Sequence, residues 1–83
     1  GRTGTHDFII TQRACPWTIE TKAGKNTPTE NQIVFANMEV EAGGMCLMIN
    51  EFNLDDVIRV AAYIDVYGQL PYFLAHDFNK YSK

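Results

Sequence analysis

Four side chains of this sequence are of types that ligate metals or act as nucleophiles: His6, Cys15, Cys46 and His76. Structural zinc sites usually draw ligands from local pairs, such as two cysteines separated by two residues, and this chain has no such pair. A cysteine nucleophile needs a histidine beside it and a third group that orients the histidine. Cys46 stands in an apolar run, where a free cysteine usually behaves as a small buried hydrophobe. We therefore expect no metal site, no cofactor and no catalytic residue, and hence a protein that is not an enzyme.

The carboxylates form no acid–base pair in the sequence either. Asp55 and Asp56 are explained by the start of a helix, where negative charge complements the helix dipole. Glu39 and Glu41 are two residues apart in a segment that we expect to be a strand, so they would share one face. That face is either a solvated strand surface or an acidic stripe that meets a basic partner.

The segment from Ala23 to Asn31, AGKNTPTEN, is rich in residues that break regular structure. Its Gly-Lys pair is only a fragment of a phosphate-binding loop, which needs a further glycine five positions earlier and a Ser or Thr after the lysine. Loops carry function more often than the strands they join. We interpret this loop either as a plain connector or as a contact element that presents Lys22 and Lys25.

Composition and charge narrow the class of protein. Eighty-three residues make one domain, which we place at 1–83, with residues 1–6 as a loose terminus or an expression remnant. The apolar fraction of 46% is too high for a disordered chain, and no apolar run approaches the roughly 20 residues of a membrane span. The net charge is −3, and no two of the seven lysines and arginines are adjacent. Nucleic-acid binders usually cluster these residues, so the charge pattern argues against such a partner.

The apolar pattern predicts strands first and helices last. Four segments alternate in polarity or carry the β-branched runs typical of strands: 7–12, 14–22, 32–42 and 45–52. The Gly43-Gly44 pair suits a tight hairpin turn between the last two. Two helices are expected at 53–68 and 69–83. This order predicts an α+β fold in which about four antiparallel strands are packed on one face by a C-terminal helical pair.

The helix expected at 53–68, NLDDVIRVAAYIDVYG, has more apolar surface than one buried stripe requires. Asn53 is a suitable N-cap and Gly68 a suitable C-terminal stop. The helical spacing predicts a core stripe made of Leu54, Val57, Ile58, Ala61 and Ile64.

Three residues of the same helix break this pattern. Tyr63 and Val66 fall in its polar sector, and Asp65 falls near the core stripe. Either another element covers Tyr63 and Asp65 lies at the helix edge, or the polar sector is an interface. The second interpretation gives a partner-binding patch, because tyrosine and arginine are favoured at interface hot spots. The residues of that patch are Arg59, Tyr63, Val66, Tyr67 and Tyr72.

The leading hypothesis is a small acidic, non-enzymatic protein-binding domain, such as an inhibitor or accessory protein of phage or mobile-element type that acts on a larger protein. Its partner would be another protein with a basic surface, or a second copy of the chain in a homodimer. The alternative is a nucleic-acid-binding module that uses the C-terminal helical pair or the 23–31 loop. With two cysteines that we expect to be reduced, and no membrane span, we expect a cytoplasmic protein.

Overall fold

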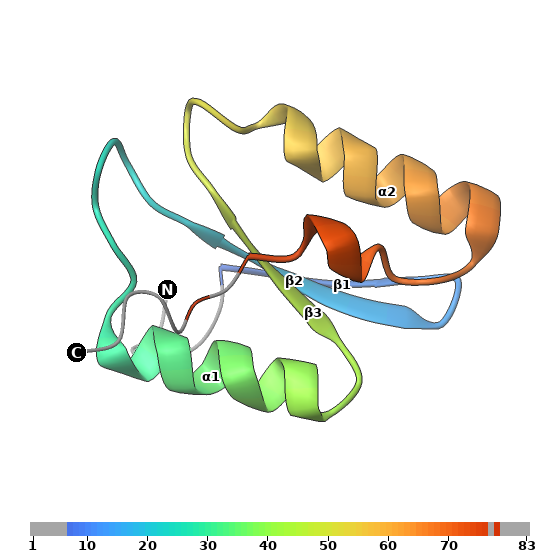
Figure 1. The fold of residues 1–83 in the computed structure, drawn as a ribbon, viewed down its shortest axis with the longest axis horizontal. Coiled ribbons are helices and arrows are strands. Elements are labelled where there is room, and N and C mark those ends of the chain that lie inside the picture. The colour runs from blue at the N-terminus through green and yellow to red at the C-terminus, as the bar shows by residue number, and fades with distance from the viewer. Residues whose placement is uncertain (1–6, 77, 79–83) are drawn as a thin grey trace.

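The computed structural model describes residues 7–76 and Phe78, so residues 1–6, 77 and 79–83 lie outside the description. Figure 1 shows the strands of one sheet crossing between two α-helices. In chain order the elements are β1 (Phe8–Gln12), β2 (Cys15–Thr21), α1 (Glu30–Glu41), β3 (Met45–Ile49), α2 (Asp55–Tyr67) and the short 3-10 helix η1 (Tyr72–Leu74). The fold is α+β, as predicted, but the described sheet has three strands and is mixed rather than antiparallel.

β1 and β2 form an antiparallel hairpin, which confirms the first two predicted strands. The register closes with Gln12 opposite Cys15, so that Arg13 and Ala14 alone connect the strands. Both connecting residues have positive φ angles, 48° for Arg13 and 62° for Ala14. Positive φ at both central residues is the mark of a type I′ turn, whose twist matches the twist of the flanking strands.

The prediction of a strand at 32–42 is wrong, because this segment belongs to helix α1 and its C-cap Ala42. A capping box starts the helix. The Thr29 hydroxyl accepts a hydrogen bond from the Gln32 N–H, and the Gln32 side chain accepts one from the Thr29 N–H. Ile33 and Ala36 are buried at the helical spacing of three. The alternation of apolar and polar residues in this segment is therefore a coincidence. The segment is a helix of which only a narrow stripe is buried.

β2 and β3 lie side by side and parallel, which gives the sheet the order β1-β2-β3. A parallel pair needs a crossover connection, and α1 provides it. The Gly43-Gly44 pair, expected in a hairpin turn, instead leads from the end of α1 into β3. Gly43 has a φ angle of 90°, which an L-residue rarely adopts. The parallel pairing is the main correction to the predicted topology.

The two helices cover opposite faces of the sheet, not one face as predicted (Figure 1). The core cluster on the α2 face consists of Cys15, Trp17, Ile19, Met45, Leu47, Ile49, Val60 and Ile64. The cluster on the α1 face consists of Ile33, Ala36, Cys46 and Phe78. Successive strand residues point to opposite faces, so β3 contributes to both clusters. This explains why β3 is apolar on both sides, as the sequence indicated.

α2 confirms the helix expected at 53–68 but shifts its buried stripe. Val60 and Ile64 are fully buried, whereas Leu54 and Ile58 are 64% and 68% exposed. Gly68 ends the helix in the left-handed conformation with a φ angle of 65°, as predicted. Among the described residues, neither this helix nor any other is long and apolar enough to cross a membrane.

The outer edge of β3 is closed by two side chains. The Met48 N–H donates to His76 Nδ1 over 2.9 Å, and Asn53 Nδ2 donates to the Met48 carbonyl over 2.9 Å. Asn53 was expected to cap α2, but Leu54 occupies the N-cap and no side-chain capping bond forms. These contacts satisfy backbone groups that a further strand would otherwise pair.

The second helix expected at 69–83 is not present in the described part of that segment. In residues 69–76 only the three residues of η1 are helical, and Ala75 after them has an extended backbone. Phe78, the other described residue of the segment, is in a 3-10 conformation. Pro71 precedes η1 with a ψ angle of 73°, which is not helical. The rest of the prediction, residues 77 and 79–83, lies outside the described residues. The expected helical pair, and the nucleic-acid-binding interpretation that depended on it, therefore have no support in residues 69–76.

Both cysteines are free thiols, and both are buried. Burial raises the pKa of Cys46 to about 11, so its thiol is protonated at neutral pH. Since the thiolate is the reactive form, Cys46 acts as a small core residue.

Candidate functional site

Polar side chains gather at the edge of the sheet where β2 and β3 end and β1 begins. In open sheets with parallel strands, ligands bind in the crevice beyond the carboxyl ends of the strands. β2 ends at Thr21 and β3 at Ile49, and the antiparallel β1 starts beside the end of β2. Four residues at or next to this edge are of interest, and we call them the strand-end site: Asp7, Glu20, Lys22 and Gln32.

Glu20 is the buried charge of the strand-end site. It is only 2% exposed, although it lies one residue from the end of β2. Gln32, in the first turn of α1, donates from Nε2 to Glu20 Oε1 over 2.7 Å. The amide oxygen of the same side chain, Gln32 Oε1, is fixed by the capping box, in which it accepts the Thr29 N–H. Glutamate is rarely buried to this degree without a compensating partner, and Gln32 is such a partner here.

Asp7 directly precedes β1, at the end of the hairpin where β2 ends. The last residue pair of the register on this side is Phe8 with Ile19. Asp7 Oδ2 accepts hydrogen bonds from the Thr21 hydroxyl and, over 2.8 Å, from the Thr21 N–H. These bonds hold the pKa of Asp7 below its usual value, so this carboxylate is ionised at neutral pH.

Lys22 supplies the positive charge of the site. It follows Glu20 by two residues and directly follows the end of β2. Its N–H donates to the Ile49 carbonyl over 2.9 Å and so extends the pairing of β2 with β3 by one residue. The Lys22 charge also contributes to the lowered pKa of Asp7, so the ammonium is within electrostatic reach of that carboxylate.

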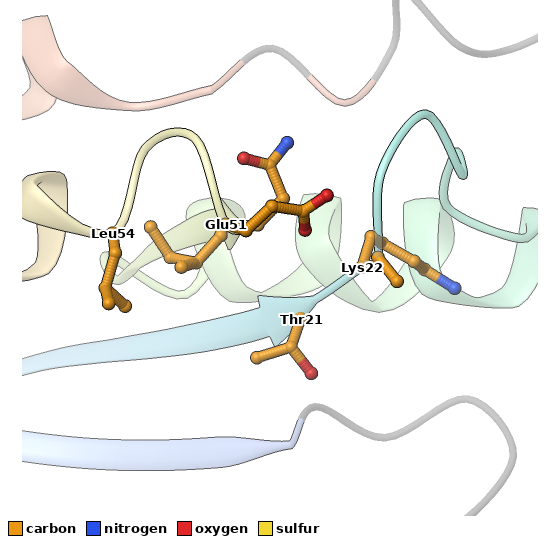
Figure 2. Close-up of a pocket in the computed structure, with 7 residues that line it drawn as sticks. Thr21, Lys22, Glu51 and Leu54 are labelled. Atoms are coloured by element: carbon orange, nitrogen blue, oxygen red, sulfur yellow. The ribbon is translucent and has the colours of Figure 1, made fainter.

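A hollow of about 370 Å³ opens beside Lys22 (Figure 2). In Figure 2, Thr21 and Lys22 stand where β2 ends, and Glu51 and Leu54 belong to the segment that leaves β3. The two Glu51 carboxylate oxygens accept the Gly24 N–H over 2.8 and 3.1 Å, and this contact lowers the pKa of Glu51. The contact ties the loop after β2 to the segment after β3, so the two walls of the hollow are connected.

The strand-end site has the chemistry to bind a phosphate ester through a divalent cation. Mg²⁺ is usually held by one or two carboxylates, with waters and substrate phosphate oxygens in the remaining positions. Lysine is a common phosphate ligand because it presents a compact positive charge. In the part of the chain that the structure describes, no group of three or more His, Cys, Asp and Glu side chains forms a metal cage. A cation here would therefore be shared between the protein and its substrate.

The residues expected to form a partner-binding patch are only partly brought together. The Tyr63 ring contacts Tyr67 at a centroid distance of 4.5 Å and Phe73 at 5.2 Å. Phe73, in η1, therefore partly covers Tyr63, as the simpler interpretation of the sequence proposed. The exposed Arg59 forms an ion pair of 3.8 Å with Asp56 on the preceding turn.

The remaining residues of the expected patch diverge. Val66 is 69% exposed on α2. The Tyr72 hydroxyl donates to the Gly43 carbonyl over 3.0 Å, so this tyrosine reaches the turn before β3. Asp65, expected near the core stripe, is exposed. Its carbonyl accepts a hydrogen bond of 2.8 Å from the Arg13 guanidinium, which anchors the β1–β2 turn to the end of α2.

The acidic stripe expected from Glu39 and Glu41 does not form on a strand, because both residues lie on α1. A spacing of two places them on different sides of a helix. Of the two lysines expected to contact a partner, Lys25 is exposed in the loop and Lys22 lines the hollow at the strand-end site. The predicted contact loop therefore adjoins this site.

Sequence reasoning missed Asp7, Glu20 and Gln32 as candidate functional residues. One signal was available: a carboxylate and a lysine two residues apart at the end of a strand, with an aspartate at the start of the strand before it. The strand was interpreted as half-buried with a solvated polar face. The burial of Glu20 depends on α1, which was not predicted, so the unusual environment of this carboxylate could not be recognised.

Comparisons with protein-family models, curated proteins and solved structures gave no match for this chain. The site is therefore interpreted from its own geometry. Fold and site together define a small α+β domain with two carboxylates and a lysine at the ends of neighbouring strands.

Proposed function

We propose that this domain hydrolyses phosphodiester bonds of nucleic acids with the help of a divalent cation. The observation that carries the proposal is the placement of Asp7, Glu20 and Lys22 at one edge of the sheet, with Glu20 buried. Lys22 adds positive charge where a bound phosphate would lie.

Each residue has a separate task in the proposed reaction. Asp7 and Glu20 would hold the cation, which when bound would supply Lewis-acid polarisation of a phosphoryl oxygen and a more acidic water. Gln32 positions the Glu20 carboxylate through its hydrogen bond. Lys22 stabilises the negative charge that develops on the phosphate. The water oxygen forms a bond to phosphorus and releases a proton to solvent, while the bond to the leaving sugar oxygen breaks and that oxygen takes up a proton from solvent.

The position of the site favours a polymeric substrate. Asp7 is exposed, and Lys22 borders an open hollow, so a nucleic-acid backbone can pass along the edge of the sheet. Lys25, exposed in the adjoining loop, offers a second positive charge for the backbone. The proposal thus keeps the 23–31 loop of the nucleic-acid alternative, and it takes the place of the expectation that the domain is not an enzyme.

Cation-dependent cleavage of labelled oligonucleotides tests this function. With Mg²⁺ or Mn²⁺ we expect the purified protein to shorten DNA or RNA strands, and with EDTA we expect no products, because the carboxylates cannot activate water alone. Electrophoresis of end-labelled substrates over time measures the rate. Single-stranded and double-stranded forms of both nucleic acids are to be compared. Intact substrates in every one of these mixtures would contradict the proposal.

A second proposal keeps the protein-binding hypothesis and concerns the outer face of α2. Ile58 and Val66 are each more than 60% exposed, and the spacing of four places them, with the exposed Ala62 between them, on one side of this helix. An apolar surface of this kind is typical of a binding site for another protein, and a second copy of the chain is the occupant that can be tested directly.

Sedimentation of the Val66→Lys variant tests the α2 face. We expect the wild-type chain to form a dimer and the variant to be a monomer, because lysine removes apolar contact but suits the last turn of a helix. Val34→Lys on α1, where Val34 is 53% exposed, is the matched control and should leave the dimer intact. A monomeric wild-type protein, or a dimer that both variants retain, would exclude a homodimer through this face.

A further inference from the structure

The outer edge of β1 is the unprotected edge of the sheet. In the part of the chain that the structure describes, β1 is the outermost strand of the order β1-β2-β3. At the opposite edge, the Met48 backbone groups of β3 are bonded to the side chains of His76 and Asn53. β1 itself, FIITQ, contains no charged residue and no proline, which are common means of keeping another strand away from a sheet edge. The β1 edge is therefore open to a further strand.

Two residues of β1 direct their backbone groups toward this open edge. Opposed residues of an antiparallel pair alternate between pairs that exchange N–H···O bonds and pairs that do not. Thr11 lies opposite Pro16, which has no N–H, so this pair is of the second kind. The pair of Ile9 and Thr18, two residues away, is of the same kind. The N–H and C=O groups of Ile9 and Thr11 therefore point away from β2, and the hydrogen bonds of turns and loops in the described chain involve neither residue.

We propose that β1 pairs with β1 of a second copy of this chain, antiparallel and about a two-fold axis at Ile10. This inference rests on the dimer proposed for the α2 face, and it names the edge through which the two copies meet. In this register Ile9 of each copy lies opposite Thr11 of the other, so each such pair exchanges both of its N–H···O bonds. The same surface then serves both copies, as a two-fold interface requires.

The charges at the two ends of β1 favour a second copy over an unrelated strand. Asp7 directly precedes β1 and Arg13 directly follows it, and both residues are exposed. Antiparallel pairing brings the first end of each strand beside the last end of the other. Each Asp7 carboxylate therefore lies near the Arg13 guanidinium of the other copy, and opposite charges meet at both ends of the paired strands.

The exposed side of α2 lies where the second copy would be. Ile10 packs against the core cluster on the α2 face of the sheet. Directly opposed residues of an antiparallel pair share one face, so both copies would carry α2 on the same face of one continuous sheet. A hollow of about 500 Å³ is lined by Gln12, the last residue of β1, and by Ile58 and Ala62 of α2. The α2 helix of the second copy would fill this space and cover the exposed Ile58.

Amide hydrogen exchange followed by NMR tests the pairing at single residues. At a concentration where sedimentation shows a dimer, we expect the N–H groups of Ile9 and Thr11 to exchange at least about 10-fold more slowly than after dilution to the monomer. The N–H groups of Ile10 and Gln12 face β2, so their exchange should change less. A dimer in which the Ile9 and Thr11 amides exchange as fast as in the monomer would overturn the inference and leave a dimer through α2 alone.

Thr11→Pro tests the same pairing by sedimentation. Proline removes the outward N–H of Thr11 and none that bonds to β2, and edge strands tolerate it. We expect the dissociation constant of the dimer to rise by about 5- to 150-fold, because each copy loses an N–H···O bond to the other. Thr11→Val keeps the N–H and is the matched control, which should dimerise as the wild type does.

Arg13→Glu keeps the inference testable if Thr11→Pro does not fold. It places two acids near each other at both ends of the paired strands and should weaken the dimer without changing the backbone groups of β1. If folded Thr11→Pro and Arg13→Glu variants dimerise normally while Val66→Lys is monomeric, the inference is wrong and the α2 dimer stands. A monomeric wild type would overturn both. Cleavage of nucleic acids is measured separately, so its absence would contradict the proposed activity and not this pairing.

Discussion

Glu20→Gln is expected to reduce cation-dependent cleavage by at least about 100-fold. Loss of a residue that only contacts a metal ligand already lowers activity by up to about 100-fold, and Glu20 is proposed to bind the cation directly. The substitution keeps the shape of the side chain and a carbonyl oxygen that can accept the Gln32 hydrogen bond of 2.7 Å. It removes the negative charge that attracts the cation. Asp7→Asn should have a similar effect, because both carboxylates hold the same ion. Initial rates with labelled oligonucleotides measure the loss.

The matched control for Glu20→Gln is Glu41→Gln, which makes the same chemical change at an exposed position near the end of α1. Glu41→Gln should cleave at the wild-type rate. The buried amide of Glu20→Gln costs about 1–3 kcal/mol if one of its N–H groups finds no acceptor, so thermal unfolding must accompany the assay. Asp7→Asn, at an exposed position, keeps the prediction testable if Glu20→Gln is unstable. Wild-type cleavage by a folded Glu20→Gln variant would show that the carboxylate has no part in the reaction.

Ile64→Ala is expected to lower the free energy of unfolding by about 2–5 kcal/mol, because it removes buried methyl groups and leaves a cavity. Ile64 is completely buried between α2 and the sheet. A domain of this size has a total stability on the order of 4–12 kcal/mol, so the loss is a large fraction of it. The melting temperature should fall by roughly 10–30 °C. Urea and thermal unfolding followed by circular dichroism measure both quantities.

Ile58→Ala is the control for this prediction, since it is the same substitution six residues earlier on the same helix. Ile58 is 68% exposed, and the change should alter stability by no more than about 0.5 kcal/mol. The sequence pattern predicted the opposite for Ile58, which was assigned to the core stripe. Equal destabilisation by Ile58→Ala and Ile64→Ala would favour that original stripe over the observed one.

The elements with strong local signals could be predicted from the sequence. The β1–β2 hairpin followed from its alternation, and α2 followed from its apolar spacing and from Gly68, whose left-handed conformation ends the helix. α1 was misassigned because Ile33, Val34 and Phe35 are β-branched or aromatic and the following residues alternate in polarity. The capping box of Thr29 and Gln32 was the stronger signal, since it marks a helix start by a hydrogen-bonding mechanism.

The topology and the strand-end site depended on that one misassigned element. With a strand at 32–42 in place of α1, the segment 45–52 was expected to pair with that strand across Gly43-Gly44 and not with β2. That arrangement lacks the crossover helix and leaves Glu20 on a solvated face. Periodicity records which residues could share a face, but it does not show that α1 covers this face or that Gln32 reaches Glu20. Those contacts depend on how separate helices and strands pack against each other, which periodicity within one segment does not show.

The neighbouring positions of Asp7 and Glu20 also have a thermodynamic consequence. Opening the β1–β2 hairpin separates the segments that carry the two residues, so the unfolded chain does not hold both carboxylates near one cation. A cation that binds them only in the folded state acts as a ligand of folding as well as of catalysis. At a free concentration one hundred times its dissociation constant, such a cation would add about 2.7 kcal/mol to the stability of the domain. The fraction of folded protein would then depend on the divalent-ion content of its surroundings.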